Sequence, residues 1–322
     1  MQALRRLGFW LPLAVMFVWG LLVLVWHQDT VRETAFTLFM FIALASSLNI
    51  LLGYTGYVSF GHIVFFGLGG YFGFYLLSQH NWSLLPAAFA GGVMSAIIAG
   101  LLGLAILRLR GAYFALATIG INEAARSFVD NFSPFGGATG MFVNFSAYQS
   151  YGGAGPALWY TFTCLWLVTM AVLLVSYLVK HSRFGLGLMA IREDEDAAMV
   201  MGVKAPRAKT IAFMLSAFAP GMIGVLYFFK NGNVEPGDAF QLHMSIEMLV
   251  MVMLGGMGTV FGPLLGAVTY VGLRGYLLTS PIFKSLHLAV AGLILLLIIL
   301  FVPAGAVGWV RDRIPRLRRA LE

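Results

Sequence analysis

Long apolar runs separated by short polar turns make up most of the chain. Between Glu33 and Arg108 the sequence contains no Asp, Glu, Lys or Arg. Because about 20 apolar residues cross a hydrocarbon core of about 30 Å, this interval predicts about three membrane-spanning helices. The same reasoning, applied to the whole chain, predicts ten spans, near residues 8–26, 33–52, 59–78, 84–107, 112–130, 157–179, 209–229, 243–260, 262–279 and 285–303. Polar and apolar positions alternate too weakly for a lipid-facing barrel, so the expected fold is an all-α polytopic membrane protein with one domain over residues 1–322.

The composition leads to the same class of protein. Of the 322 residues, 60% are hydrophobic and 10% are charged, whereas typical soluble domains carry about 25% charged residues. So few charges could not cover the water-facing surface of a soluble protein of this length, which excludes a cytosolic enzyme and a disordered chain. The net charge of +7 does not indicate nucleic-acid binding, because a soluble domain with clustered lysines and interleaved aromatic residues is missing. The single cysteine, Cys164, permits no internal disulfide.

The positions of Lys and Arg predict the orientation in the membrane, because excess positive charge stays on the cytoplasmic side. If the N-terminus is cytoplasmic, the inner loops and ends hold 15 of the 20 Lys and Arg residues. With ten spans, both termini are then cytoplasmic. The alternative is that Arg5, Arg6 and the apolar stretch at 8–26 form a cleaved signal peptide. However, no small-x-small cleavage site precedes His27, and the loss of one span would spoil the charge distribution.

Small residues mark places of close helix packing and of helix breaks. Ala212, Ser216 and Pro220 repeat every four residues, as do Ala217 and Gly221, so one span has a face with small side chains. Such a face lets helix backbones approach closely. Two similar glycine clusters lie in uncharged turns between spans, Gly53, Gly56 and Gly61 in the first and Gly255, Gly256, Gly258 and Gly262 in the second. They predict helix breaks and a weak internal repeat, with chance similarity in a glycine-rich chain as the alternative.

One strongly hydrophilic segment interrupts the apolar chain. Residues 183–209 carry nine of the 33 charged residues and lie on the predicted cytoplasmic side. The pattern predicts a short helix with acidic residues in its first turn, a body from Ala197 to Met201 and Gly202 as its terminator. Ala197, Ala198 and Met201 are expected to form a small apolar side that another protein can contact. The alternative is a solvated loop without a partner.

The chain carries no catalytic or nucleotide-binding motif. The sequence lacks G-x-x-x-x-G-K-[ST], H-E-x-x-H, C-x-x-C and G-x-S-x-G patterns, so any ATP hydrolysis would have to take place on another subunit. The six histidines are scattered without ligand spacing. We therefore expect no metal site, no bound cofactor and no enzymatic activity of this chain by itself.

A few ionisable residues lie within the predicted spans. Glu123, Arg126 and Asp130 are spaced by three and four, which places them on one helix face where opposite charges can neutralise each other. They are interpreted either as a structural ion pair near the outer boundary or as part of a polar path. His62 and Glu247 begin their spans, and both are expected at the membrane interface. Buried carboxylates do not follow one another across several spans, which counts against a proton-coupled carrier.

Four segments in register resemble the permease subunits of ATP-driven branched-chain amino acid importers. The segments are residues 48–62 (LNILLGYTGYVSFGH), 108–118 (RLRGAYFALAT), 190–202 (AIREDEDAAMVMG) and 254–263 (LGGMGTVFGP). Together with their flanks they extend over roughly residues 33 to 310, and the match looks closest to the larger of the two permeases that pair in these importers. The resemblance implies the permease fold of such importers and a location in the bacterial inner membrane.

The resemblance also implies partners for the hydrophilic segment. In the family, the loop at about 181–209 docks on an ATPase subunit, and its Glu-Ala-Ala-x-x-x-Gly core matches Asp196, Ala197, Ala198 and Gly202. The residues implied in ATPase coupling are Arg192, Glu193, Asp196, Ala197, Ala198 and Gly202. The implied partners are a homologous second permease, two ATP-binding subunits and an extracytoplasmic solute-binding protein. Leu186 and Met189 stand where the family often has Arg, and Pro220 stands where Ala is usual, so some ATPase contacts are expected to differ.

The resemblance favours a branched-chain or other hydrophobic amino acid as the solute, with urea, short amides and aromatic acids as alternatives within the family. A zwitterion is expected to use polar side chains or helix ends for its charged groups. Candidates near the glycine breaks are Asn49, Ser59, Thr118 and Glu123. Two different classes remain open, an ion-coupled carrier that works alone and a membrane scaffold that transports nothing.

Overall fold

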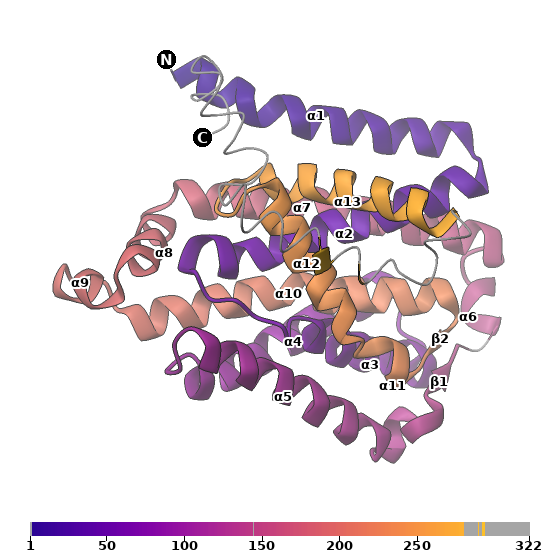
Figure 1. The fold of residues 1–322 in the computed structure, drawn as a ribbon. Coiled ribbons are helices and arrows are strands. Elements are labelled where there is room, and N and C mark those ends of the chain that lie inside the picture. The colour runs from indigo at the N-terminus through magenta and orange to yellow at the C-terminus, as the bar shows by residue number, and fades with distance from the viewer. Residues whose placement is uncertain (1, 144, 280–288, 290–291, 294–322) are drawn as a thin grey trace.

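A computed structural model describes residues 2–143, 145–279, 289 and 292–293 (Figure 1). The described chain is almost entirely helical, as the apolar pattern predicts. The helices are α1 (Gln2–Trp26), α2 (Asp29–Thr55), α3 (Ile63–His80), α4 (Leu84–Ile106), α5 (Ala112–Asp130), α6 (Phe145–Gln149), α7 (Ala154–His181), α8 (Arg183–Glu193), α9 (Glu195–Val200), α10 (Ala205–Asn231), α11 (Pro236–Ala239), α12 (Leu242–Gly255) and α13 (Gly262–Thr279). Two short 3-10 turns, η1 (Ser133–Phe135) and η2 (Gly137–Thr139), and two short strands, β1 (Met141–Phe142) and β2 (Asn233–Val234), complete the described elements.

The predicted spans correspond well to the helices. Nine of the ten fall on described helices, while the tenth, at 285–303, lies outside the described residues. The third span begins four residues later than expected, because residues 56–62 form a loop that leads into α3. Within the described residues, five stretches are long and apolar enough to cross a membrane: Asp29–Thr55, Leu84–Ile106, Ala154–His181, Ala205–Asn231 and Pro236–Gly255. The prediction of an all-α polytopic membrane protein is confirmed, with the number of spans approximate.

Helix α2 forms the centre of the molecule. It is apolar on all sides and is buried almost continuously from Ala35 to Thr55, as expected for a helix that other helices surround. Its neighbours are α1, α7, α8, α10, α12 and α13. The core of the protein is therefore arranged around α2, whose apolar side chains pack against the surrounding helices.

Helix α10 packs against α3 and α4 with almost no side chain between the backbones. A Cβ atom placed on Gly221 would lie 2.3 Å from Ser95 Oγ, and one on Gly224 would lie 2.2 Å from the Phe66 carbonyl oxygen. Both distances are shorter than any real van der Waals contact, so only glycine fits at these positions. The predicted face of small residues is confirmed, and α3, α4 and α10 form one closely packed unit.

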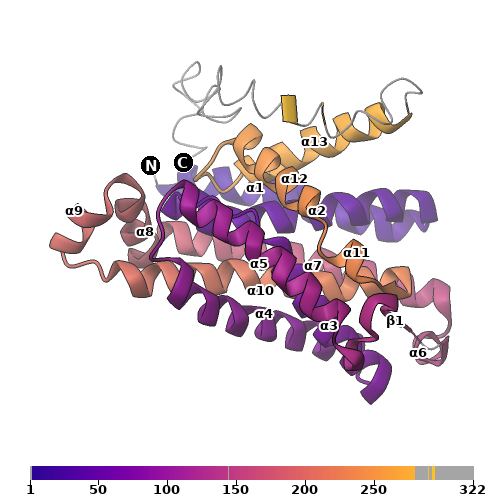
Figure 2. The same cartoon turned by 60° about the horizontal axis from the view of Figure 1, so that its bottom comes forward.

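The two ends of the helices differ in character. Helices α8 and α9 project at one end, and α6 and the β1–β2 pair lie at the other (Figures 1 and 2). At the end that carries β1 and β2, Met141 pairs with Val234 in an antiparallel ladder, and Lys230 of α10 forms an ion pair with Glu33 of α2. The loops at 56–62, 107–111 and 256–261 all lie at the end that carries α8 and α9, as the contacts below show.

Candidate functional site

The hydrophilic segment folds into two helices and not the single short helix that the sequence predicts. The Ser182 side chain accepts a hydrogen bond from the Gly185 N–H at the start of α8. Asp194 then adopts an extended conformation (φ −157°, ψ 113°), and its Oδ1 accepts hydrogen bonds from the N–H groups of Asp196 and Ala197. An Asp in this position satisfies the free N–H groups of a first turn, so Asp194 ends α8 and starts α9.

Gly202 terminates α9, as predicted. Its φ angle is +92°, a left-handed conformation that glycine adopts without steric cost. The N–H of Val203 donates to the Ala198 carbonyl oxygen at 3.0 Å and closes the last turn. The chain can therefore reverse sharply from α9 into α10.

The expected apolar side of α9 is confirmed for Ala197 and Met201, which are exposed, but not for Ala198. Ala198 is 4% exposed and packs inward in a cluster with Leu188 and Ile191 of α8. The small side chain of Ala198 lets α9 lie close to α8. Because Ala198 is buried there, it cannot contact another protein. The large apolar residues that are exposed here are Met199, Val200 and Met201, with exposed fractions of 41%, 87% and 85%. We call these three residues the α9 tip.

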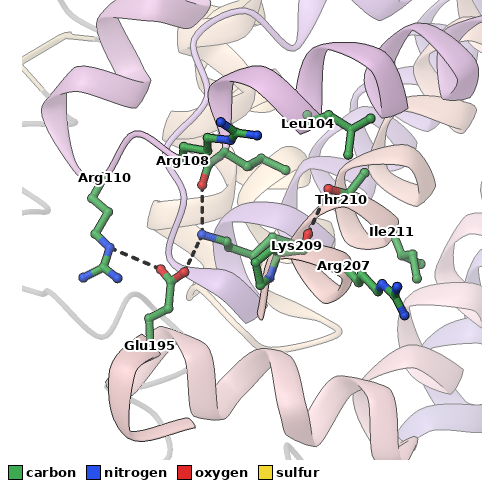
Figure 3. Close-up of a pocket in the computed structure, with 11 residues that line it drawn as sticks. Leu104, Arg108, Arg110, Glu195, Arg207, Lys209, Thr210 and Ile211 are labelled. Atoms are coloured by element: carbon green, nitrogen blue, oxygen red, sulfur yellow. Dashed lines mark hydrogen bonds and ion pairs between the residues drawn. The ribbon is translucent and has the colours of Figure 1, made fainter. Parts of the chain in front are cut away.

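A buried lysine fastens α9 to the ends of the spanning helices (Figure 3). The Lys209 Nζ atom donates to Glu195 Oε1 at 2.6 Å, to the Tyr57 hydroxyl at 2.8 Å and to the Leu107 carbonyl oxygen at 2.9 Å. Its side chain is 4% exposed and that of Glu195 is 13% exposed. Because an ammonium group has three donors, all of them are used, and the burial of this charge is compensated. We call Tyr57, Glu195 and Lys209 the Lys209 cluster.

An exposed ion pair adds a second contact between α9 and the rest of the chain. Both guanidinium Nη atoms of Arg110 donate to the Asp196 carboxylate, at 3.2 and 2.9 Å. This hydrogen-bonded guanidinium holds the pKa of Asp196 below its usual range. Because both side chains are exposed to solvent, the pair contributes little stability and mainly orients the first turn of α9.

The two glycine clusters contact each other directly. The sequence showed only that they are similar. The Asn49 side chain of α2 donates to the Thr259 carbonyl oxygen at 2.9 Å and accepts from the Gly258 N–H at 3.0 Å. A Cβ on Gly53 would lie 2.6 Å from the Gly258 nitrogen. Gly56 ends α2 with φ +77°, and Gly256 and Gly258 have φ angles of +119° and +74°. We call Asn49, Gly53, Gly258 and Thr259 the glycine junction.

Arg192 connects the hydrophilic segment to the glycine junction. Its Nη1 atom donates to the Gly53 carbonyl oxygen at 2.9 Å. The side chain also lies against Gly56 and Gly258, because a Cβ on these glycines would lie 3.3 and 2.9 Å from Arg192 atoms. A displacement of α8 would therefore act on the ends of α2 and α12 through one side chain.

The structure brings together two of the four candidate path residues. The Phe60 N–H donates to Thr118 Oγ1 at 3.1 Å, so Thr118 lies beside the loop that carries the buried Ser59. Asn49 lies apart from them in the glycine junction. Glu123 is exposed on α5, and the ion pairs of the described residues do not join it to Arg126 or Asp130. Glu123 and Arg126 therefore lie on the exposed side of α5, and Asp130 is half-buried at its end.

Two residues expected at the membrane interface are buried within the protein. His62 is completely buried, and its Nε2 donates to the Ser216 carbonyl oxygen at 2.9 Å. Glu247 is 1% exposed and pairs with Arg274 at 3.0 Å. In each case a partner on another helix compensates the burial, which position in a span does not reveal. Their depth at the interface stays a prediction.

Sequence reasoning missed Tyr57, Glu195 and Lys209 as members of one site. The sequence signal that could have revealed this site is Lys209, a lysine at the start of an apolar run. The sequence analysis used this lysine only to predict the orientation in the membrane. Within the described residues, His, Cys, Asp and Glu side chains do not form a group of three that could hold a metal ion.

A helical membrane protein with a hydrophilic segment docked on paired helix breaks fits the class of transport permeases. A family model described as "Branched-chain amino acid transport system / permease component" matches residues 30–299. The chain belongs to this family of ABC transporter permeases, whose members are transport subunits.

The chain is similar along most of its length to two permeases of Escherichia coli K12. The high-affinity branched-chain amino acid transport system permease protein LivM is 30% identical over 304 residues, which cover 85% of this chain and 69% of LivM. The corresponding protein LivH is 23% identical over 292 residues, or 82% and 90% of the two chains. The L-arabinose transport system permease protein AraH of the same strain is 26% identical over 165 residues, which cover 48% of each chain. No solved structure matches the chain.

Proposed function

We propose that this chain is the membrane subunit of an ATP-driven importer for branched-chain or other hydrophobic amino acids. In this proposal it pairs with a second permease, two ATP-binding subunits power transport, and an extracytoplasmic binding protein delivers the solute. The inner membrane holds the complex, with both termini of this chain in the cytoplasm. The observation that carries the proposal is the contact of Arg192 with Gly53, which joins the hydrophilic segment to the helix breaks.

The α9 tip is the proposed contact with an ATP-binding subunit. Val200 and Met201 are almost fully exposed at the end of a charged segment that projects from the helices. Exposed apolar side chains surrounded by polar residues are typical of protein interaction sites. Movement of the tip would reach the spanning helices by two routes, through the Lys209 cluster into α10 and through Arg192 into the glycine junction.

Helix α5 offers the proposed contact with the second permease. Its inner side carries Phe114, Thr118 and Asn122, which are buried and spaced by four. Its outer side exposes large apolar residues such as Tyr113 and Leu116, at 76% and 65%. The similarity of the chain to both LivM and LivH, two permeases of branched-chain amino acid transport systems, supports a pair of homologous permeases. A path between the two would run beside Glu123, which is exposed on α5.

Uptake by the reconstituted complex tests the proposal. Proteoliposomes that contain this chain, the second permease, the ATP-binding subunits and the binding protein are expected to accumulate labelled leucine only when ATP is supplied. Competition with urea, short amides and aromatic acids would identify the preferred solute. Leucine uptake driven by an ion gradient in the absence of the ATP-binding subunits would contradict the proposal and favour a carrier that works alone.

Variants of the α9 tip test the docking surface. The double variant Val200→Glu/Met201→Glu is expected to insert into the membrane but to lose both co-purification of the ATP-binding subunits and leucine uptake. Phe142→Glu is the matched control, because Phe142 is 65% exposed at the opposite end of the molecule, and it should keep the ATP-binding subunits bound. Normal co-purification with the double variant would show that the tip is not the docking surface.

A further inference from the structure

A pocket of about 490 Å³ opens between the C-terminal end of α4 and the N-terminal end of α10. Three arginines line it, Arg108 and Arg110 from the connection between α4 and α5 and Arg207 from α10 (Figure 3). Lys209 and Glu195 of the Lys209 cluster form its inner wall. The lining thus holds four cationic side chains and one carboxylate.

Two of the arginines are available for a ligand. Arg110 is used by Asp196, and the carboxylate of Glu195 is neutralised by Lys209. Arg108 and Arg207 are exposed, and the ion pairs of the described residues do not include either of them. After these pairings the pocket keeps a positive surplus, which favours an anion with several oxygen acceptors, such as a phosphate.

The rest of the pocket is apolar and continues onto the side of a spanning helix. Leu104 of α4 and Ile211 of α10 line the pocket and are 64% and 48% exposed. Large exposed apolar residues follow the outer side of α4 along its whole length: Leu85, Phe89, Val93, Ile97, Leu101 and Leu104. Because α4 is long and apolar enough to cross a membrane, this row is a surface for lipid tails, and it ends in the pocket.

We propose that this pocket binds the headgroup of an anionic phospholipid. The phosphate lies between Arg108 and Arg207, and an acyl chain follows the exposed row of α4 toward the bilayer centre. Basic pockets between spanning helices at the cytoplasmic face bind anionic headgroups in this way. A free phosphate ion would bind to the arginines but leave Leu104 and Ile211 uncovered. A pocket with a basic part and an apolar part therefore favours a lipid over a free anion. The site is distinct from the α9 tip and from the proposed path for the solute.

Lipid titrations followed by native mass spectrometry test the proposal on the assembled complex. Phosphatidylglycerol is expected to be retained in preference to phosphatidylethanolamine. Arg108→Gln and Arg207→Gln should each weaken phosphatidylglycerol binding about fivefold, and the double variant about 25-fold. Arg183→Gln, which removes an exposed arginine of the same end outside the pocket, should leave binding unchanged.

Three results would overturn the proposal. The first is equal retention of both lipids, or unchanged phosphatidylglycerol binding by the double variant. The second is that inorganic phosphate displaces the lipid at comparable concentration, because the site would then be one for a free anion. The third is that the double variant loses the ATP-binding subunits while its lipid content stays the same, because the arginines would then face that subunit.

Discussion

Helices α10 and α5 both contact α3 and are held in different ways. The middle of α10 contacts α3 and α4 through glycines at positions where a Cβ would collide with backbone or side-chain atoms. Helix α5 contacts α3, α11 and η2, and its outer side exposes Tyr113, Leu116 and Phe128. The difference indicates that α3, α4 and α10 move as one body, whereas α5 is held by fewer contacts and exposes an apolar face, which we propose contacts the second permease.

The largest effect is expected from a side chain at the packed face of α10. Gly224→Leu would force the α3 and α10 backbones apart, because its Cβ alone would lie 2.2 Å from the Phe66 carbonyl oxygen. Overpacking of this kind costs about 1–3 kcal/mol or more, and the thermal midpoint of the purified protein should fall sharply. Gly120→Leu on α5 is the matched control, since its Cβ would meet nothing within 4 Å. Equal losses in the two variants would remove the distinction between the helices.

Loss of the buried lysine should have the next largest effect. Lys209→Met leaves the 13% exposed Glu195 carboxylate without its main cation. Because this carboxylate is in contact with solvent and lies 3.5 Å from Arg110, the loss should stay well below the about 3–5 kcal/mol typical of a fully buried pair. Thermal unfolding should show the loss, and limited proteolysis should cleave the α8–α9 segment faster. The double variant Lys209→Met/Glu195→Gln should recover part of the stability. If the single variant unfolds like the unmodified protein, the Lys209 cluster does not fasten α9.

A smaller effect is expected on the outer side of α5. Leu116→Gln should leave the stability of this chain unchanged but reduce co-purification of the second permease by about tenfold, as expected for an anchor residue in an interface. Leu101→Gln on α4 is the control, because Leu101 is 67% exposed on the proposed lipid-facing row. A reduction caused by Leu101→Gln and not by Leu116→Gln would place the second permease on α4.

The smallest effect is expected at the exposed ion pair. Arg110 holds the pKa of Asp196 below its ordinary value of 3.8, so the contribution of the pair is fully present above about pH 4 and disappears as the pH falls through the lower pKa of the folded protein. Asp196→Asn should therefore change the proteolysis rate of the α8–α9 segment only slightly at pH 7, and added salt should reduce that change further. A loss as large as that of Lys209→Met would contradict the ranking.

Hydropathy and residue spacing were sufficient for the elements of the fold. Apolar run lengths placed nine spans on described helices, because the bilayer sets the length of each span. The four-residue spacing of small residues from Ala212 to Gly221 predicted the packed face of α10, since helical periodicity is a local property. Gly202 was recognised as a helix terminator because the preference of glycine for left-handed backbone conformations is also a local property.

The arrangement of the site could not be read from the sequence. The Lys209 cluster joins residues 57, 195 and 209, and the glycine junction joins Asn49 to Thr259, so both depend on how distant helices pack. The orientation of Ala198 depends on the break at Asp194, which turns α9 relative to α8. The local pattern predicts where a helix and its apolar residues lie along the chain, but tertiary contacts decide which of these residues face outward.

The coupling of hydrolysis to uptake in an Arg192 variant tests the central claim most directly. Arg192→Gln removes the guanidinium that contacts the Gly53 carbonyl oxygen, while Arg183→Gln makes the same change at an exposed arginine at the start of α8 and serves as the control. Leucine uptake and ATP hydrolysis would be measured on the same proteoliposomes of the complete complex. We predict that Arg192→Gln retains its ATP-binding subunits and hydrolyses ATP but imports about tenfold less leucine for each ATP consumed, with no such change for Arg183→Gln. An unchanged ratio for Arg192→Gln would contradict the account.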